Sequence, residues 1–119
     1  MSNIEKINYK DNDIFSIVHK GSEDEMIAAQ EKLVNMVRNT GREDILMLID
    51  MTDAVITPKY HQRMKKLGKE TTPIINKAAV VGMSTGIKSV IINGFIKFSG
   101  MKMKLFNSIE KAKEWLVEN

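Results

Sequence analysis

Two uninterrupted apolar runs constrain the fold more than any other feature of this sequence. Residues 45–49 read Ile-Leu-Met-Leu-Ile, and residues 78–81 read Ala-Ala-Val-Val. A short apolar run of this kind is typical of a strand that is covered on both faces, as in a parallel sheet. Parallel strands need a crossover of a dozen or more residues between them, most often a helix. The two runs therefore predict an α/β fold.

Helix start signals follow the predicted strands. Ser22 and Glu25 have the spacing of a capping box, in which the serine side chain accepts from a free amide and the glutamate reaches back to the cap. Thr57 stands before Pro58, which suits the first helical position because its missing amide costs nothing there. We expect helices over about residues 23–39, 58–71 and 87–99, and a last one from residue 109 onward.

The remaining strands are shorter or more polar. Residues 4–9 and 14–19 are rich in β-branched and aromatic residues and are separated by an Asp/Asn turn, which predicts an N-terminal β-hairpin. Residues 102–106 alternate basic and apolar side chains, as in an edge strand. The element order is then ββαβαβαβα. It predicts a single domain over residues 1–119, with a mostly parallel central sheet covered by about four helices.

Four stretches of the chain are similar to one family. They begin at Ile45, Lys77, Phe95 and Phe106, and the last has the pattern Phe-x-x-x-Glu-x-Ala-x-x-Trp-Leu over residues 106–116. These stretches resemble the SpoIIAA-like branch of the STAS-like proteins, which is related in fold to anti-sigma-factor antagonists and more distantly to CRAL-TRIO lipid-binding domains. The resemblance implies a small sheet covered by helices and, as for many members, no established biochemical activity.

The resemblance also bears on phosphorylation. Anti-sigma-factor antagonists carry a phosphorylatable serine at the start of the helix after the central strand, whereas residues 50–59 of this chain contain no serine. Thr57 lies nearby, at a predicted helix N-terminus that favours a phosphate. It also has a structural reason to be there as the helix cap. Both interpretations of Thr57 stay open.

The charge of the chain is unevenly distributed. Residues 1–57 contain six Lys/Arg and eleven Asp/Glu, a net charge of −5, whereas residues 58–119 contain twelve and four, a net charge of +8. On the predicted helix over 58–71, basic side chains lie opposite the apolar stripe. This basic face is formed by Lys59, Arg63, Lys66 and Lys69. It is either a solvated helix face or a surface for an anionic membrane or an acidic partner.

The predicted helix over 87–99 is apolar on two sides. Ile92 and Ile96 lie one turn apart on the arc opposite its core face, with Lys88 and Lys97 close by. Such a helix requires a second apolar partner. The alternatives are a homodimer or another protein interface, the wall of an apolar ligand pocket, contact with lipid, or burial under a neighbouring helix.

One glycine-containing turn is a candidate anion loop. Gly82, Ser84, Thr85 and Gly86 lie between a predicted strand and a predicted helix. The turn either binds an anion through free amides or uses glycine for backbone geometry. Its spacing does not match a phosphate-binding P-loop.

A second group combines two carboxylates and an imidazole. Asp50, Asp53 and His61 are expected near the carboxyl end of the central strand, where open α/β sheets bind their ligands. A carboxylate and a histidine can form an acid–base pair. Because no motif supplies a nucleophile, we expect no catalytic residues.

Composition excludes several classes of protein. Without cysteine and with two histidines, the chain has no disulfide, thiolate metal site or thiol nucleophile, and we expect no metal and no cofactor. Aromatic residues are only 6%, and Tyr60 lies on the core side of its helix, which disfavours nucleic acid as a partner. The nine methionines are interpreted as adaptable core filler. No apolar run reaches the roughly 18 residues of a membrane span, so we expect a cytoplasmic protein, either free or peripheral to a membrane.

Three functional hypotheses follow. The leading one is a non-enzymatic STAS-like binding or regulatory domain that contacts a second subunit, a protein partner or an apolar ligand. The second is a peripheral membrane or lipid-handling protein that uses the basic face and the predicted helix over 87–99. The third is a small hydrolase or transferase built on Asp50, Asp53 and His61.

Overall fold

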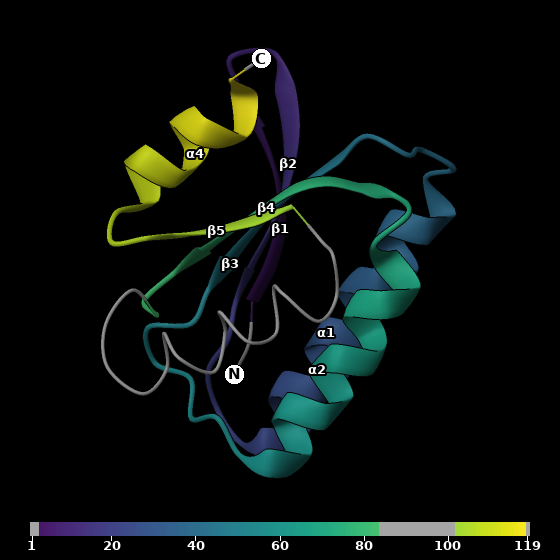
Figure 1. The fold of residues 1–119 in the computed structure, drawn as a ribbon, viewed down its shortest axis with the longest axis vertical. Helices are drawn as coiled ribbons and strands as arrows, with labels where there is room; N and C mark the ends of the chain where they lie inside the picture. The colour runs from purple at the N-terminus through teal and green to yellow at the C-terminus, as the bar shows by residue number, and fades with distance from the viewer. Residues whose placement is uncertain (1–2, 84–101, 119) are drawn as a thin grey trace.

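A five-stranded sheet with helices on both faces forms the protein (Figure 1). The computed structural model describes residues 3–83 and 102–118, so the predicted helix over 87–99 lies outside the described residues. The elements are β1 (Asn3–Tyr9), β2 (Asn12–Val18), α1 (Glu23–Asn39), β3 (Ile45–Asp50), α2 (Pro58–Thr71), β4 (Ile75–Val81), β5 (Met103–Phe106) and α4 (Ile109–Val117). Their order confirms the α/β prediction, including the N-terminal hairpin.

The strands of the sheet lie in the order in which they occur in the chain, from β1 to β5. β1 and β2 pair antiparallel, and every later neighbour pairs parallel. The predicted mostly parallel sheet and its short edge strand at β5 are therefore confirmed. Because β2, β3, β4 and β5 run in one direction, their carboxyl ends meet at the same edge of the sheet.

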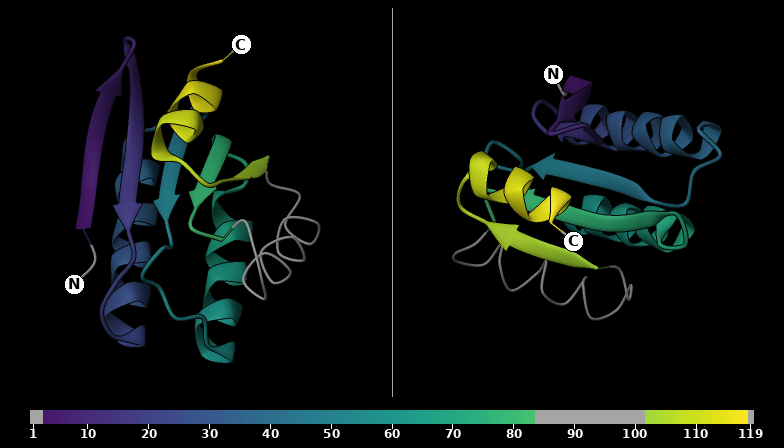
Figure 2. Two further views of the ribbon diagram at one scale, coloured as in Figure 1. Left: turned by 90° about the vertical axis from the view of Figure 1, so that its left-hand side faces the viewer. Right: turned by 90° about the horizontal axis from the view of Figure 1, so that it is seen from above.

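The helices form two layers around the sheet. Figure 2 shows α1 and α2 side by side on one face and α4 on the other. Side chains of β3 point alternately to the two faces of the sheet and so contribute to both hydrophobic layers. Ile45 and Met47 pack on the α1 side, whereas Leu46 and Leu48 pack with α4. A strand covered on both faces is what the uninterrupted apolar run predicted.

Both predicted helix caps are confirmed. The Glu25 N–H donates to Ser22 Oγ at 3.1 Å, and the Ser22 N–H donates to Glu25 Oε1 at 3.1 Å. Thr57 accepts from the Tyr60 N–H at 3.1 Å, and its hydroxyl also donates to the carboxylate of Glu23 in the first turn of α1. A phosphate on Thr57 would face that carboxylate, so the structure favours the structural interpretation of this residue.

β4 begins at Ile75, three residues before the apolar run that predicted it. Lys77 interrupts the apolar pattern, yet its side chain is buried and lies on the α4 side of the sheet. Its ammonium donates to the carbonyl oxygens of Trp115 at 2.8 Å and Glu118 at 2.7 Å, and lies 4.9 Å from the centre of the Trp115 ring. The carboxyl end of a helix carries partial negative charge, which suits a buried cation.

The turns that follow β3 and β4 pack closely against each other. The Met51 N–H donates to the Val81 carbonyl at 2.8 Å, and Asp50 Oδ1 accepts from both the amide and the hydroxyl of Thr52. Gly82 has a φ of +90°, and a Cβ at this position would lie 2.5 Å from the Thr52 nitrogen. Glycine is required here for both its backbone angle and its lack of a side chain.

Candidate ligand pocket

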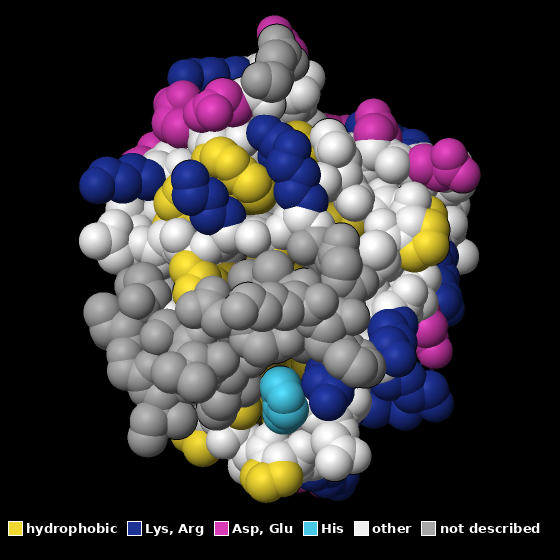
Figure 3. Space-filling view, in the orientation of Figure 1, with side chains coloured by type: hydrophobic (Ala, Val, Ile, Leu, Met, Phe, Trp, Pro, Cys, Tyr) yellow, Lys and Arg dark blue, Asp and Glu magenta, His cyan; other side chains and the backbone are white. Residues whose placement is uncertain are grey.

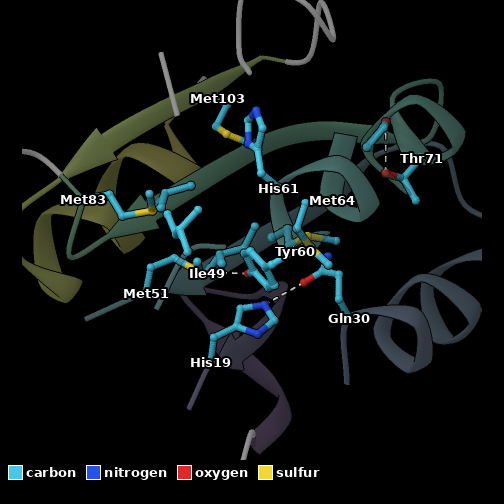
Figure 4. Close-up of a pocket in the computed structure, with 14 residues that line it drawn as sticks. His19, Gln30, Ile49, Met51, Tyr60, His61, Met64, Thr71, Met83 and Met103 are labelled. Carbon is cyan, nitrogen blue, oxygen red and sulfur yellow. Dashed lines mark hydrogen bonds between the residues drawn. The ribbon is translucent and has the colours of Figure 1, made fainter. Parts of the chain in front are cut away.

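A pocket lies between the sheet and the helices α1 and α2, and it reaches the carboxyl edge of the sheet at His19, Met51 and Met83 (Figure 4). Its cavity has a volume of about 70 Å³. Most of its wall is apolar and includes the side chains of Met47, Ile49, Met51, Ile56, Met64, Val80, Met83 and Met103. Among the described residues that line it, none is Lys, Arg, Asp or Glu. The site is therefore an apolar pocket with a few neutral or weakly basic polar groups.

Strand alternation and helix periodicity explain how these side chains meet. Met47 and Ile49 project to one face of β3, and Met51 continues the same alternation beyond the end of the strand. On the opposite wall, Tyr60 and Met64 lie one turn apart on α2. Residues that would otherwise complete a core thus surround a cavity.

Methionine dominates the wall of this pocket. Of the seven methionines within residues 3–83 and 102–118, five line it, and three of these, Met47, Met51 and Met83, are buried. Core filler, the role expected for the methionines from the sequence, describes the buried Met26 but not the methionines that border the cavity. Methionine has three flexible bonds and a polarizable sulfur, so a wall of this composition adapts to the shape of a ligand.

His19 and Gln30 are two buried polar side chains of the pocket, and neither is among the candidate site residues of the sequence. His19 follows β2 and is fully buried, with its Nε2 2.8 Å from Gln30 Oε1. Its ring packs edge-on against Tyr60 with 5.9 Å between the ring centres. No described residue forms a hydrogen bond with His19 Nδ1. The histidine is held from two sides and keeps one unpaired nitrogen.

Burial sets the protonation of both rings. Burial lowers the pKa of His19 and raises the pKa of the Tyr60 phenol. Both side chains are therefore neutral at neutral pH. The Tyr60 hydroxyl has a weak partner, the Met51 sulfur at 3.5 Å.

The buried histidine predicts a loss of stability in acid. The unfolded chain restores the ordinary His19 pKa of about 6.5, whereas the folded pKa lies lower. Below pH 6.5 or so the unfolded state thus binds a proton that the folded state does not. The free energy of unfolding should fall as the pH falls through this window, by up to about 1.4 kcal/mol per pH unit. Urea unfolding midpoints between about pH 7.5 and pH 5 measure this slope. A His19→Phe variant with an equally steep slope would contradict the assignment to His19.

The three residues considered for acid–base chemistry are not brought together in the pocket. His61 is half-buried and lines it, beside Met103 in Figure 4. Asp50 is engaged by Thr52, Asp53 is exposed, and neither lines the pocket. His61 therefore has no carboxylate partner among the described lining residues.

Two of the four residues of the basic face form ion pairs that connect α2 to α1. The Lys59 ammonium lies 3.1 Å from Asp24 Oδ1, and the Arg63 guanidinium lies 2.6 Å from Glu31 Oε2. Lys66 and Lys69 are exposed. Figure 3 accordingly shows Lys and Arg side chains next to Asp and Glu side chains along one margin of the molecule. Lys59 and Arg63 are already paired with acidic residues of the same chain, which weakens the case for a membrane-binding face.

Several predicted positions lie outside the described residues. They are Ser84, Thr85 and Gly86 of the candidate anion loop and Lys88, Ile92, Ile96 and Lys97 of the predicted helix. Over residues 3–83 and 102–118, the structure contains no group of three or more metal-ligating His, Asp or Glu side chains. None of the helices in these ranges is long and apolar enough to cross a bilayer.

Comparison with known proteins agrees with this architecture. A family model described as SpoIIAA-like matches residues 14–117. Among solved structures, the chain is similar to an uncharacterized protein from the DUF3478 family with a SpoIIAA-like fold, from Shewanella loihica PV-4. The TM-score is 0.78 at 18% sequence identity, over 97% of this chain and 93% of the other. No curated protein matches the chain.

Proposed function

The chain belongs to the SpoIIAA-like family, and from that premise we propose that it is a small non-enzymatic binding domain that holds an apolar ligand at the carboxyl edge of its sheet. One observation carries the proposal, namely the cavity of about 70 Å³ with its methionine-rich wall. Small-molecule sites are mostly apolar with a few convergent polar groups. Open α/β sheets place such sites at the carboxyl ends of their strands.

The size of the cavity limits the ligand. An apolar cavity that holds benzene has a volume of about 150 Å³, roughly twice the volume found here. The methionine side chains supply the difference, because rotating them widens the cavity without moving the backbone. A molecule of one ring therefore suits this pocket better than a long lipid chain, which requires several hundred Å³.

Toluene binding tests the proposal directly. With ¹³C-labelled methionine methyl groups, toluene should shift the signals of the five pocket methionines, which are Met47, Met51, Met64, Met83 and Met103. Met36 on α1 does not line the pocket and serves as the internal control. Pocket methyl signals that stay fixed, or that move no more than Met36, would refute the proposal.

A pair of adjacent substitutions locates the binding site. Ile56 lines the pocket, whereas its neighbour Val55 is 68% exposed and does not. Ile56→Trp should fill the cavity and weaken toluene binding by at least about tenfold, because the larger side chain takes the space of the ligand. Val55→Trp should bind toluene as the unmodified protein does. Equal losses in the two variants would place the ligand elsewhere.

A further inference from the structure

We infer that the pocket takes an amphipathic ligand, whose ring lies among the methionines and whose carboxylate lies at the rim of the pocket against the imidazole of His61. The inference rests on the proposed function, because it names the chemistry of the ligand held in the same pocket. Three features of the described residues support it: the position of His61, the internal contacts of the other polar side chains, and the charge carried by α2.

His61 lies where the pocket meets solvent. It lines the pocket and is half-buried, whereas the other polar side chains among the described lining residues are buried. Met64 and Met103 also line the pocket and are half-buried, and these three side chains are called the rim. Figure 4 shows the His61 ring reaching from α2 toward Met103 on β5. A polar group at this rim keeps part of its hydration, while a ring attached to it reaches the apolar wall.

The other polar side chains of the described wall have partners within the protein. His19 Nε2 lies 2.8 Å from Gln30 Oε1, the Thr71 hydroxyl donates to a carbonyl oxygen of its own helix at 3.0 Å, and the Tyr60 hydroxyl lies 3.5 Å from a methionine sulfur. The His61 ring forms no hydrogen bond or ion pair with another described residue. Among the described lining residues, His61 is therefore the polar side chain that is both partly exposed and without an internal partner.

The charge around His61 favours an anionic group over a cationic one. α2 carries five basic side chains and one acidic side chain, and no Asp or Glu is among the described residues that line the pocket. His61 is in the first turn of this helix, where the backbone amides contribute partial positive charge. An imidazole has an N–H that can donate to a carboxylate whether the ring is neutral or protonated.

The rim also limits the cost of holding a charge. An ionised carboxylate that is buried in an apolar interior without a partner loses its hydration at great cost. At the rim it stays in contact with solvent and accepts from His61, and only the ring enters the cavity. A single aromatic ring with one carboxylate, such as benzoate, meets both requirements. An ammonium group in the same place meets an imidazole and a basic helix, which disfavour it.

Three ligands that share one ring separate the apolar contact from the charge. Toluene is uncharged, benzoate carries a carboxylate and benzylammonium a positive charge, and each is titrated against the unmodified protein and against His61→Leu. We expect benzoate to bind the unmodified protein at least as tightly as toluene, and benzylammonium to bind more weakly than either. The substitution should weaken benzoate by about tenfold, the effect of losing a hydrogen bond to a charged group, and leave toluene within about twofold.

Gln62→Leu is the matched control. Gln62 follows His61 on α2, is exposed and does not line the pocket, so its substitution should leave the binding of all three ligands within about twofold. Equal losses of benzoate and toluene in His61→Leu would mean that this residue only shapes the cavity, which would overturn the inference. Benzylammonium binding as tight as benzoate would overturn it as well.

A second measurement uses the unmodified protein and so does not depend on the folding of His61→Leu. The chain has two histidines, and with ¹⁵N-labelled histidine benzoate should shift the ring signals of His61 more than toluene does. Toluene binding without benzoate binding, or His61 signals that stay fixed at saturating benzoate, would overturn the inference and leave the proposed function standing. If no ring ligand binds, the proposed function fails and the inference fails with it.

Discussion

Replacing Gly82 with alanine is expected to destabilise the protein by about 3 kcal/mol or more. Two costs add at this position. The φ of +90° is strained for any residue with a side chain, at about 1–2 kcal/mol. The new Cβ would also lie 2.5 Å from the Thr52 nitrogen and 2.7 Å from its Cα, which are backbone atoms that cannot rotate away. The turns after β3 and β4 would have to separate.

Gly41→Ala is the matched control for this substitution. Gly41 has a φ of +70°, but nothing lies within 4 Å of the position its Cβ would take. Its alanine variant therefore bears only the backbone strain, of about 1–2 kcal/mol. The difference between the unfolding free energies of the two variants, measured in urea, gives the cost of the steric clash between the two turns. Equal losses of stability would mean that the turn at Thr52 relaxes freely.

Replacing Lys77 with methionine is expected to cost about 2 kcal/mol of unfolding free energy. Methionine keeps most of the apolar stem but loses both hydrogen bonds to the carbonyl oxygens of Trp115 and Glu118. Hydrogen bonds from a charged donor contribute about 1.5–3 kcal/mol each, and the avoided burial of the charge offsets part of that sum. The lost contacts hold the carboxyl end of α4, so its amide hydrogens should exchange faster with solvent.

Lys104→Met is the comparison for Lys77→Met. Lys104 is on the neighbouring strand β5 and also lies near an aromatic ring, with 5.6 Å between its ammonium and the centre of Phe106. Because Lys104 is exposed, its substitution should change stability by less than about 0.5 kcal/mol. If Lys104→Met destabilises the protein as much as Lys77→Met, general loss of positive charge rather than the α4 contact is responsible.

The features that sequence analysis predicted correctly are mostly local. The capping box of Ser22 and Glu25 spans four residues, and Thr57 needs only the following turn to act as a cap. The buried run of β3 and the alternation of β5 are also visible within one element. Such signals depend on the backbone geometry of a few neighbours, so the sequence contains all the information they need.

The errors and omissions involve partners far apart in the chain. The apolar run predicts a strand over residues 78–81, whereas β4 also includes Lys77, which is buried because its ammonium finds acceptors 38 and 41 residues away. The sequence places His19 at the end of a predicted strand, and nothing local in the sequence shows that Gln30 meets it. The pocket was missed for a related reason. Alternation places Met47, Ile49 and Met51 on one face, but it does not show whether the space over that face is filled.

The order of the strands bears on how the chain folds during synthesis. Each strand pairs with the strand that precedes it in the chain, from the hairpin of β1 and β2 to β5 at the far edge. When a strand leaves the ribosome, the strand with which it pairs has therefore already been synthesised. The edge of the growing sheet is covered by the next strand of the chain. A vectorial assembly of this kind shortens the time for which the central strands, the most apolar part of the chain, are open to aggregation.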